Sequence, residues 1–435
     1  MKVAVVLTML LLISTNLLAQ FPPSAQNQLA GGLGVTWIDN QPFYAVHVRP
    51  EFSISNVGIG LDLLLEVDAH GNLRKEDFQQ FSDYVRVIRY VSYGKENDPL
   101  FLKLGALDYV TLGHGSIVNT YNNSPSFDAR KTGLQLNLNF DKGGIQTIYG
   151  NFAQAGVAGI RAFVNPLQFT SMADAPILGN LEVGATYATD FDKYANIDTV
   201  RSLMPLDVGT NGSLNIIGAD IGLPLVKNDF VRLELYSDFV KIVNLGSGAT
   251  VGILFNGDAT ELLKVRAKME RRFNGDQYLP GYFGPFYEIE RFNALSGFSS
   301  KSYALKYLTN NNNGVYGELL IRLINTFDII GSYQKFDRDS SGALHLAADV
   351  APKDAPFIAR AGYDKINIID FHDLVTTDDR SFLYAEVGYK PIDYLIVSTM
   401  YMWTFSPMYD ADNNVVGYGP QRKIEPRVTF VYPLK

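Results

Sequence analysis

Four basic side chains near the middle of the chain recur at even spacing. Lys264, Arg266 and Lys268 are separated by single residues, and Arg272 resumes the series after Glu270. In an extended strand, a spacing of two places side chains on the same face. A row of cations on one face would attract anionic solutes if that face lined a water-filled passage. The row could instead pair with carboxylates on neighbouring strands, and the sequence leaves both roles open.

Other charged residues alternate with apolar residues in the same way. Besides the basic row, we predict that the same face carries Asp62, Glu66, Glu318, Arg322 and Glu386. Such a face presents both signs of charge. It would suit a passage for small hydrophilic solutes, with a preference for anions as one option.

A histidine and a serine stand one residue apart in a Gly-His-Gly-Ser stretch. They are His114 and Ser116, and Asn119, Asn122 and Asn123 follow them. A base beside a hydroxyl, oriented by an amide, is an arrangement that nucleophilic catalysis uses. The pattern is similar to the His-x-Ser arrangement with a later Asn in outer-membrane phospholipase A, which implies a hydrolase as the weakest alternative. The simpler interpretation is a Gly-rich loop with a solvent-facing His, so we assign no catalytic residue and expect no enzyme.

Two acidic stretches have the spacing of calcium ligands but each lacks an essential residue. Asp337 begins one, and an EF-hand loop would then need a carboxylate where Ala348 stands. Asp410 and Asp412 begin the other, and Val415 occupies the place of the required Gly. The chain has no Cys, which excludes thiolate metal sites and disulfides. We therefore expect no metal site and no cofactor.

An aromatic, turn-rich stretch falls within a long segment, 273–299. Its aromatic residues include Tyr278, Tyr282, Phe283, Phe286 and Tyr287. Long segments of this kind are candidates for gates and binding loops. The stretch could constrict a lumen, stack on sugars or a partner, lie on a lipid interface, or fold over a rim.

The elements that must position these side chains are extended strands. Apolar residues alternate with polar or small ones over 57–68 and 134–141, and similar patterns recur almost to the last residue. Weaker alternation marks further strands, among them 84–93, 301–309 and 394–404. The clear strands run to about ten residues, longer than most strands of soluble sheets. They predict an all-β fold, a single antiparallel transmembrane β-barrel of roughly 18 strands (16–20). A secreted two-sheet protein is the alternative.

The N-terminus predicts export. Lys2 precedes an apolar stretch (3–13), and small residues follow it up to Ala19. We expect residues 1–19 to be a cleaved signal peptide and 20–435 to form the barrel. No later apolar run is long enough for a spanning helix. The net charge of −8 argues against nucleic acid as a partner.

The connections between strands differ in length. Short turns rich in Gly, Asn, Asp and Pro, such as 141–144 and 391–393, alternate with longer segments. The longer segments are 111–129, 166–179, 189–212, 273–299 and 404–423. We expect the short turns on one rim of the barrel and the long loops on the other.

This pattern resembles that of bacterial outer-membrane β-barrel proteins as a broad, porin-like class. The resemblance implies location in the cell outer membrane, contact with its lipid, and insertion by the barrel-assembly machinery. That machinery recognises a last strand of alternating residues, which Val428, Phe430 and Tyr432 supply, although Lys435 replaces the usual aromatic terminus. Any other protein partner is left unspecified.

The sequence therefore favours a porin-like channel for small hydrophilic solutes with a mixed-charge lumen. The second hypothesis is a non-conducting barrel that acts as a scaffold or as a component of a secretion or surface-assembly complex. Lumen width, and whether segment 273–299 fills the lumen, would separate the two.

Overall fold

The structure is a computed structural model. It describes residues 28–38, 41–68, 70–72, 87–124, 131–153, 156–193, 212–228, 230–259, 262–293, 299–308, 313–324, 326–337, 342–351, 355–392, 395–410 and 415–433. The expected signal peptide, 1–19, lies outside these residues. No helix among them is long and apolar enough to cross a membrane.

The described chain is almost entirely β-structure, as the alternation predicts. The strands are β1 (Gln28–Ile38), β2 (Gln41–Ile54), β3 (Val57–Leu61), β4 (Leu63–Asp68), β5 (Ile88–Tyr93), β6 (Leu100–Gly105), β7 (Gly133–Phe140), β8 (Gly143–Tyr149), β9 (Val157–Val164), β10 (Glu182–Asp190), β11 (Leu214–Lys227), β12 (Val231–Ile242), β13 (Ser247–Ala259), β14 (Leu263–Asn274), β15 (Phe292–Asn293), β16 (Ser299–Ser300), β17 (Gly314–Leu323), β18 (Phe327–Phe336), β19 (Gly342–Val350), β20 (Phe357–Ile368), β21 (Ser381–Ile392), β22 (Leu395–Tyr409) and β23 (Val415–Pro433). Short helices interrupt them: η3 (Pro166–Phe169), η4 (Leu178–Asn180), α3 (Tyr287–Glu290), α4 (Lys301–Lys306) and η6 (Asp373–Val375).

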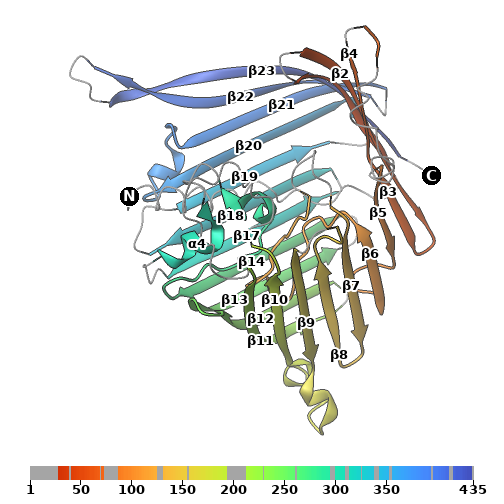
Figure 1. The fold of residues 1–435 in the computed structure, drawn as a ribbon, viewed down its shortest axis with the longest axis vertical. Helices are drawn as coiled ribbons and strands as arrows, with labels where there is room; N and C mark the ends of the chain where they lie inside the picture. The colour runs from red at the N-terminus through yellow and green to blue at the C-terminus, as the bar shows by residue number, and fades with distance from the viewer. Residues whose placement is uncertain are drawn as a thin grey trace.

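The strands pair with their sequence neighbours in one antiparallel sheet (Figure 1). The sheet holds 21 strands, and β3 and β4 are successive parts of one wall strand because both pair with β2, which leaves 21 − 1 = 20 in the described wall. β23 also pairs with β1, from Gln28↔Pro433 to Leu33↔Val428, so the first and last strands of the sheet are hydrogen-bonded neighbours. The seam is short, and the outer part of the β22–β23 hairpin runs on as a two-stranded ribbon (Figure 1). The fold is the expected antiparallel barrel, with a strand number inside the predicted range.

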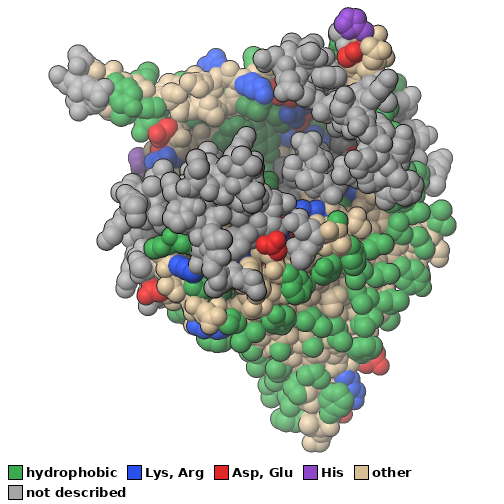
Figure 2. All heavy atoms as spheres, in the orientation of Figure 1, with side chains coloured by type: hydrophobic (Ala, Val, Ile, Leu, Met, Phe, Trp, Pro, Cys, Tyr) green, Lys and Arg blue, Asp and Glu red, His purple; other side chains and the backbone are tan. Residues whose placement is uncertain are grey.

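Alternation decides which side chains face out. Large apolar side chains are exposed on one face of the strands, while their neighbours in sequence are buried or polar and point to the inside. The exposed set includes Val183, Ile217, Ile221, Leu235, Phe239, Val251, Ile253, Leu319, Val387 and Val397. Figure 2 shows hydrophobic side chains spread over the outer face of the wall. A sheet that pairs its own backbone and presents an apolar exterior is what a bilayer requires.

The two rims differ, but not quite as the sequence predicts. One rim carries short turns such as 55–56 and 141–142, together with the first residue of β1 and the last of β23. The opposite rim carries the long connections 106–132 and 275–313. Segment 165–181 is the exception: it joins β9 to β10 on the short-turn rim, because three antiparallel strands of the wall, β7, β8 and β9, separate it from 106–132.

Two local expectations were wrong. Residues 301–309, expected as a strand, begin with α4, whose first turn is capped by the Ser300 side chain accepting from the Tyr303 N–H. Leu305 of α4 is buried in an apolar cluster with residues of 107–121 and 278–287, so tertiary contacts override the weak alternation. Most of 404–423, expected as a loop, extends β22 and β23, paired from Thr404↔Gln421 to Met408↔Gly417.

A charge placed on the outer face should be costly, whereas the same charge on the inner face should be tolerated. Ile253 lies in the middle of β13 with an exposed outward side chain, and Asn256 faces the inside on the same strand. We expect Ile253→Lys to lower the free energy of unfolding by about 2–4 kcal/mol, and Asn256→Lys by less than about 1 kcal/mol. Urea unfolding in phospholipid vesicles measures both, and equal losses would contradict the assigned orientation.

Candidate functional site

Two segments from the long-loop rim fold into the barrel and cover part of its inner wall. The first inward segment is 106–124, and the second is 275–293 with 299–308. Their apolar side chains share one buried cluster with inward-facing residues of β8–β12. From the segments the cluster takes Leu107, Val110, Leu112, Ile117, Val118, Tyr121, Tyr278, Tyr282, Phe283, Tyr287 and Leu305, and from the wall Ile148, Val157, Ala188, Leu214, Ile216, Val240 and Ile242.

Glycines on the inner face of the wall make room for this cluster. A Cβ at Gly218 would lie 2.8 Å from the Ile117 side chain, and one at Gly248 would lie 2.1 Å from the Tyr278 ring. Both contacts are closer than real carbon atoms approach. The wall is therefore shaped to receive the inward segments.

The two inward segments are hydrogen-bonded to each other. The Gly281 N–H donates to the Ser116 carbonyl at 2.9 Å, and the Phe283 N–H donates to the Ile117 carbonyl at 3.0 Å. The rings of Tyr282, Phe283 and Tyr287 pack against one another in edge-to-face and tilted arrangements, with ring centroids 4.8–5.6 Å apart. The segments therefore form one body inside the barrel.

Polar contacts anchor this body to β10. The Tyr287 hydroxyl donates to Asp190 Oδ2 at 2.6 Å, and Arg291 Nε lies 3.0 Å from the same oxygen. Burial, and then the nearby Asp190 charge, raise the pKa of Tyr287 well above its usual value, so its proton stays in place. Asp190 thus has two donors from the second inward segment.

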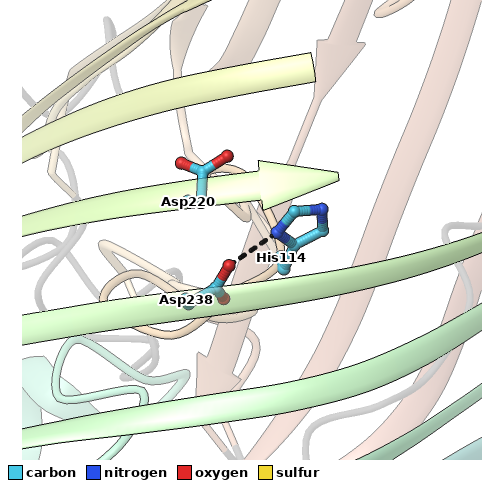
Figure 3. Close-up of side chains that lie close together, drawn as sticks. All are labelled: His114, Asp220 and Asp238. Carbon is cyan, nitrogen blue, oxygen red and sulfur yellow. Dashed lines mark hydrogen bonds and ion pairs between the residues drawn. The ribbon is translucent and has the colours of Figure 1, made fainter. Parts of the chain in front are cut away.

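His114 is the main polar contact between the first inward segment and β12. Its Nδ1 lies 2.8 Å from Asp238 Oδ1 (Figure 3). Its Nε2 lies 3.5 Å from Glu234 Oε1, and its ring stacks on Tyr236 with centroids 4.0 Å apart. Ser116 Oγ donates to the other oxygen of Asp238. The His114 side chain is 7% exposed and Asp238 is 5% exposed, so these charges compensate one another away from water.

The electrostatics favour a charged imidazole. Burial alone would lower the pKa of His114, but hydrogen bonds to Asp238 and Glu234 outweigh burial and raise the pKa to about 9. An imidazolium held between two carboxylates is therefore the form present at neutral pH.

The same cluster does not form a nucleophile–base pair. The Ser116 hydroxyl donates to Asp238 and the His114 Nδ1 binds that carboxylate too, so both groups use one acceptor. A serine nucleophile would need its hydroxyl on a neutral imidazole nitrogen.

A cation site is possible by distance alone in this region. Ligand atoms of His114, Asp220 and Asp238 lie within 4.8 Å of one another. Arg161 already makes two hydrogen bonds to Asp220, from Nε at 3.0 Å and from Nη2 at 2.5 Å. A metal ion would therefore displace a guanidinium and meet a protonated imidazole, which makes the site a poor one.

The basic row on β14 is divided by its surroundings. Lys264 and Arg266 are exposed, and Lys264 pairs with exposed Asp258 at 3.2 Å. Lys268 is buried: its Nζ lies 2.8 Å from Glu270 and donates to the His114 carbonyl at 2.7 Å. Arg272 is buried against Glu270 at 2.6 Å. The first two members of the row therefore face accessible space, whereas Lys268 ties the first inward segment to the wall and Arg272 is paired within the wall.

The part of the wall from β17 to β21, which begins beside β14, carries charges of both signs with more access to water. On it, Arg322 makes two bonds of 2.8 Å to Asp328, and Arg360 bridges Asp349 at 2.8 Å and Glu386 at 3.2 Å. Arg360 and Asp349 are 38% and 41% exposed. The side chains of this wall point to the inside, since their apolar neighbours in sequence occupy the outer face.

The remaining expected residues also take inward positions. Asp62, Glu66 and Glu386 are buried, and Glu318 accepts a hydrogen bond from the Tyr316 hydroxyl. In the aromatic stretch, Tyr278, Tyr282, Phe283 and Tyr287 are buried and Phe286 is half-buried. Their roles as pore lining, gate or binding loop remain predictions.

Sequence reasoning missed the carboxylates that receive the first inward segment. Asp220 lies between Ala219 and Ile221, and Asp238 precedes Phe239, a spacing that could have placed both carboxylates on the inner face. Their link to His114 joins residues 124 apart, and no local pattern carries that information.

Comparison with known proteins gives a resemblance of fold only. No protein-family model matches the chain, and no curated protein matches it significantly. A similar strand arrangement occurs in the siderophore receptor PirA from Acinetobacter baumannii (TM-score 0.40, 9% identity, 94% of this chain and 81% of that one). Another occurs in Wzi, an outer-membrane protein involved in group 1 capsule assembly in Escherichia coli and described as a carbohydrate-binding β-barrel (TM-score 0.38, 11% identity, 99% and 88%).

A third structure is longer than this chain. CdiB from Acinetobacter baumannii has a TM-score of 0.31 and 4% identity over 94% of this chain, which spans only 60% of that protein. Scores of this size identify neither a family nor an activity. The functional argument therefore depends on the geometry of this chain.

Removing the charge of Asp238 should loosen the first inward segment. We expect Asp238→Asn to lower the free energy of unfolding by about 3 kcal/mol, because a protonated His114 would lose its charged partner in a buried site. The matched control is Asp258→Asn, whose pair with Lys264 is half-exposed; its loss should stay below about 1 kcal/mol. Urea unfolding compares the two, and similar losses would contradict the anchoring role of Asp238.

The His114 contact should also depend on pH. Because the folded pKa is about 9 and the ordinary value 6.5, its stabilisation is complete below pH 6.5 and is lost as the pH rises through 9. The free energy of unfolding of the wild type, measured relative to that of His114→Gln, should therefore fall as the pH rises from 6.5 through 9. Urea midpoints across this range measure the difference, and a constant difference would exclude the protonated contact.

Proposed function

We propose that the protein is an outer-membrane β-barrel that forms a passive channel for small hydrophilic solutes. The N-terminal sequence supports export, and the paired wall with its apolar exterior supports residence in a bilayer. The channel would be off-centre. It would run between the inward segments, which cover the β8–β14 side, and the wall from β17 to β21.

The observation that carries the proposal is the accessible charge of the wall from β17 to β21. Arg360, Asp349 and Arg322 each keep about a third or more of their side-chain surface open, although they point to the inside of the barrel. Charges inside a filled barrel would be buried, as those of Lys268 and Glu270 are. Water beside a mixed-charge wall is what a path for hydrophilic solutes needs.

A second candidate function is a plugged barrel that serves as a scaffold or as part of a surface-assembly complex. The observation in its favour is the buried apolar cluster that the inward segments build inside the lumen. A barrel whose inner body is fixed this firmly could carry partners without conducting. Catalysis is no part of our proposal, since Ser116 and His114 share the Asp238 carboxylate.

Ion selectivity tests the channel directly. We expect Lys264→Gln combined with Arg266→Gln to reduce the chloride-to-potassium permeability ratio by about twofold or more, because two exposed lumenal cations are lost. Lys227→Gln, at the exposed end of β11, is the control and should leave the ratio unchanged. Reversal potentials in planar bilayers give the ratio. Folded protein that never conducts would overturn the channel and favour the plugged barrel.

A further inference from the structure

The barrel wall is uneven in height. β8 and β9 have 7 and 8 residues, whereas β11 has 14. With a rise of about 3.3 Å per residue and a tilt of about 45°, β8 and β9 reach only ~16–19 Å across the membrane, while β11 reaches ~33 Å. The apolar band of such barrels is about 25 Å tall, so the short strands alone do not cover it.

Segment 165–181 lies where the wall is short. It connects β9 to β10 on the short-turn rim, and its η3 and η4 turns project beyond the strands at the bottom of Figure 1. β10 pairs with β11 only as far as Glu182↔Gly222, so β11 continues past it through Leu223–Lys227. η4 packs beside β11. The segment therefore stands in line with the overhanging part of the wall.

The backbone of segment 165–181 is hydrogen-bonded within the segment. The Gln168 side chain donates to the Gly179 carbonyl at 2.7 Å and to the Ala173 carbonyl at 3.2 Å. The Asn165 side chain donates to the carbonyls of Asn180 and Leu181 at 3.3 and 3.2 Å. Internal pairing of this kind lets an irregular segment leave water at reduced cost.

The apolar side chains of the segment point the other way, to the surface. Phe169 is 66% exposed, Met172 46%, Ile177 42% and Leu178 47%. Exposed apolar side chains continue onto β11 at Leu225 and Val226. Lys142 lies beside them, with Nζ 4.8 Å from the Phe169 ring centroid and bonded to the Gln168 carbonyl at 2.9 Å. A lysine at the edge of an apolar patch is typical of a membrane interface.

We propose that segment 165–181 is a lipid-embedded extension of the barrel wall. It completes the apolar surface beyond the ends of the short strands β8–β10 and contacts phospholipid of the membrane leaflet on the short-turn side. Continuity with the apolar outer face favours lipid over a water-soluble protein partner, because the exposed side chains extend the existing belt. The inference rests on the proposed placement of the barrel in a membrane.

Single-cysteine variants test the segment, because the chain has no Cys of its own. Phe169→Cys and Ile177→Cys place a bimane fluorophore on the segment, Val183→Cys places it on the outer face of β10, and His70→Cys places it on an exposed turn. The purified chain is reconstituted in phosphatidylcholine vesicles, with and without brominated acyl chains. Quenching by bromine reports lipid contact, and quenching by iodide reports water.

We expect labels at 169 and 177 to behave like that at 183, with iodide quenching several-fold weaker than at 70 and strong quenching by brominated lipid. If the labels on Phe169→Cys and Ile177→Cys are quenched like the label on His70→Cys, while the label on Val183→Cys remains in lipid, the wall extension is wrong. The segment would then be a water-exposed docking surface. A label at 183 that matches 70 would instead overturn the membrane placement itself. Agreement between Phe169→Cys and Ile177→Cys guards against a local disturbance by one label.

Discussion

The structure depends on the requirement that backbone polar groups be paired wherever the surroundings are apolar. A chain without a spanning helix among its described residues meets that requirement by pairing each wall strand with two neighbours. The period of two then follows: one face of each strand carries exposed apolar side chains and the other faces the interior. At the seam, β23 pairs with β1 only through Val428–Pro433.

The interior is divided by the same physics of burial. On the β8–β14 side, apolar residues of the inward segments are matched by apolar or glycine positions of the wall, and the deep charges of His114, Arg161 and Lys268 each have an opposite charge beside them. On the wall from β17 to β21, charges such as those of Arg360 and Asp349 keep access to water. The off-centre passage that we propose rests on this division.

Local patterns predicted the wall well, because strand alternation is a property of adjacent residues. Leu134, Leu136 and Leu138 face out, and Gln135 and Asn137 are buried inside, as their spacing requires. The inner body could not be predicted in the same way, since its contacts join distant segments. The spacing of Lys268 predicted the face of the strand on which it lies. Only the fold shows that its ammonium group binds the His114 carbonyl and does not face open water. Weak alternation over 301–309 was misleading because packing inside the barrel favoured a helix.

The most direct test of an open passage beside the charged wall is single-channel recording of Asp349→Cys. A positively charged thiosulfonate reagent added to the conducting protein should react with this one thiol, lower the current in steps, and reverse on reduction. The parent chain, which has no Cys, should not respond. Stepwise block would support a solute path along β19 and β20. Conduction that the reagent leaves unchanged, or no conduction at all, would contradict it.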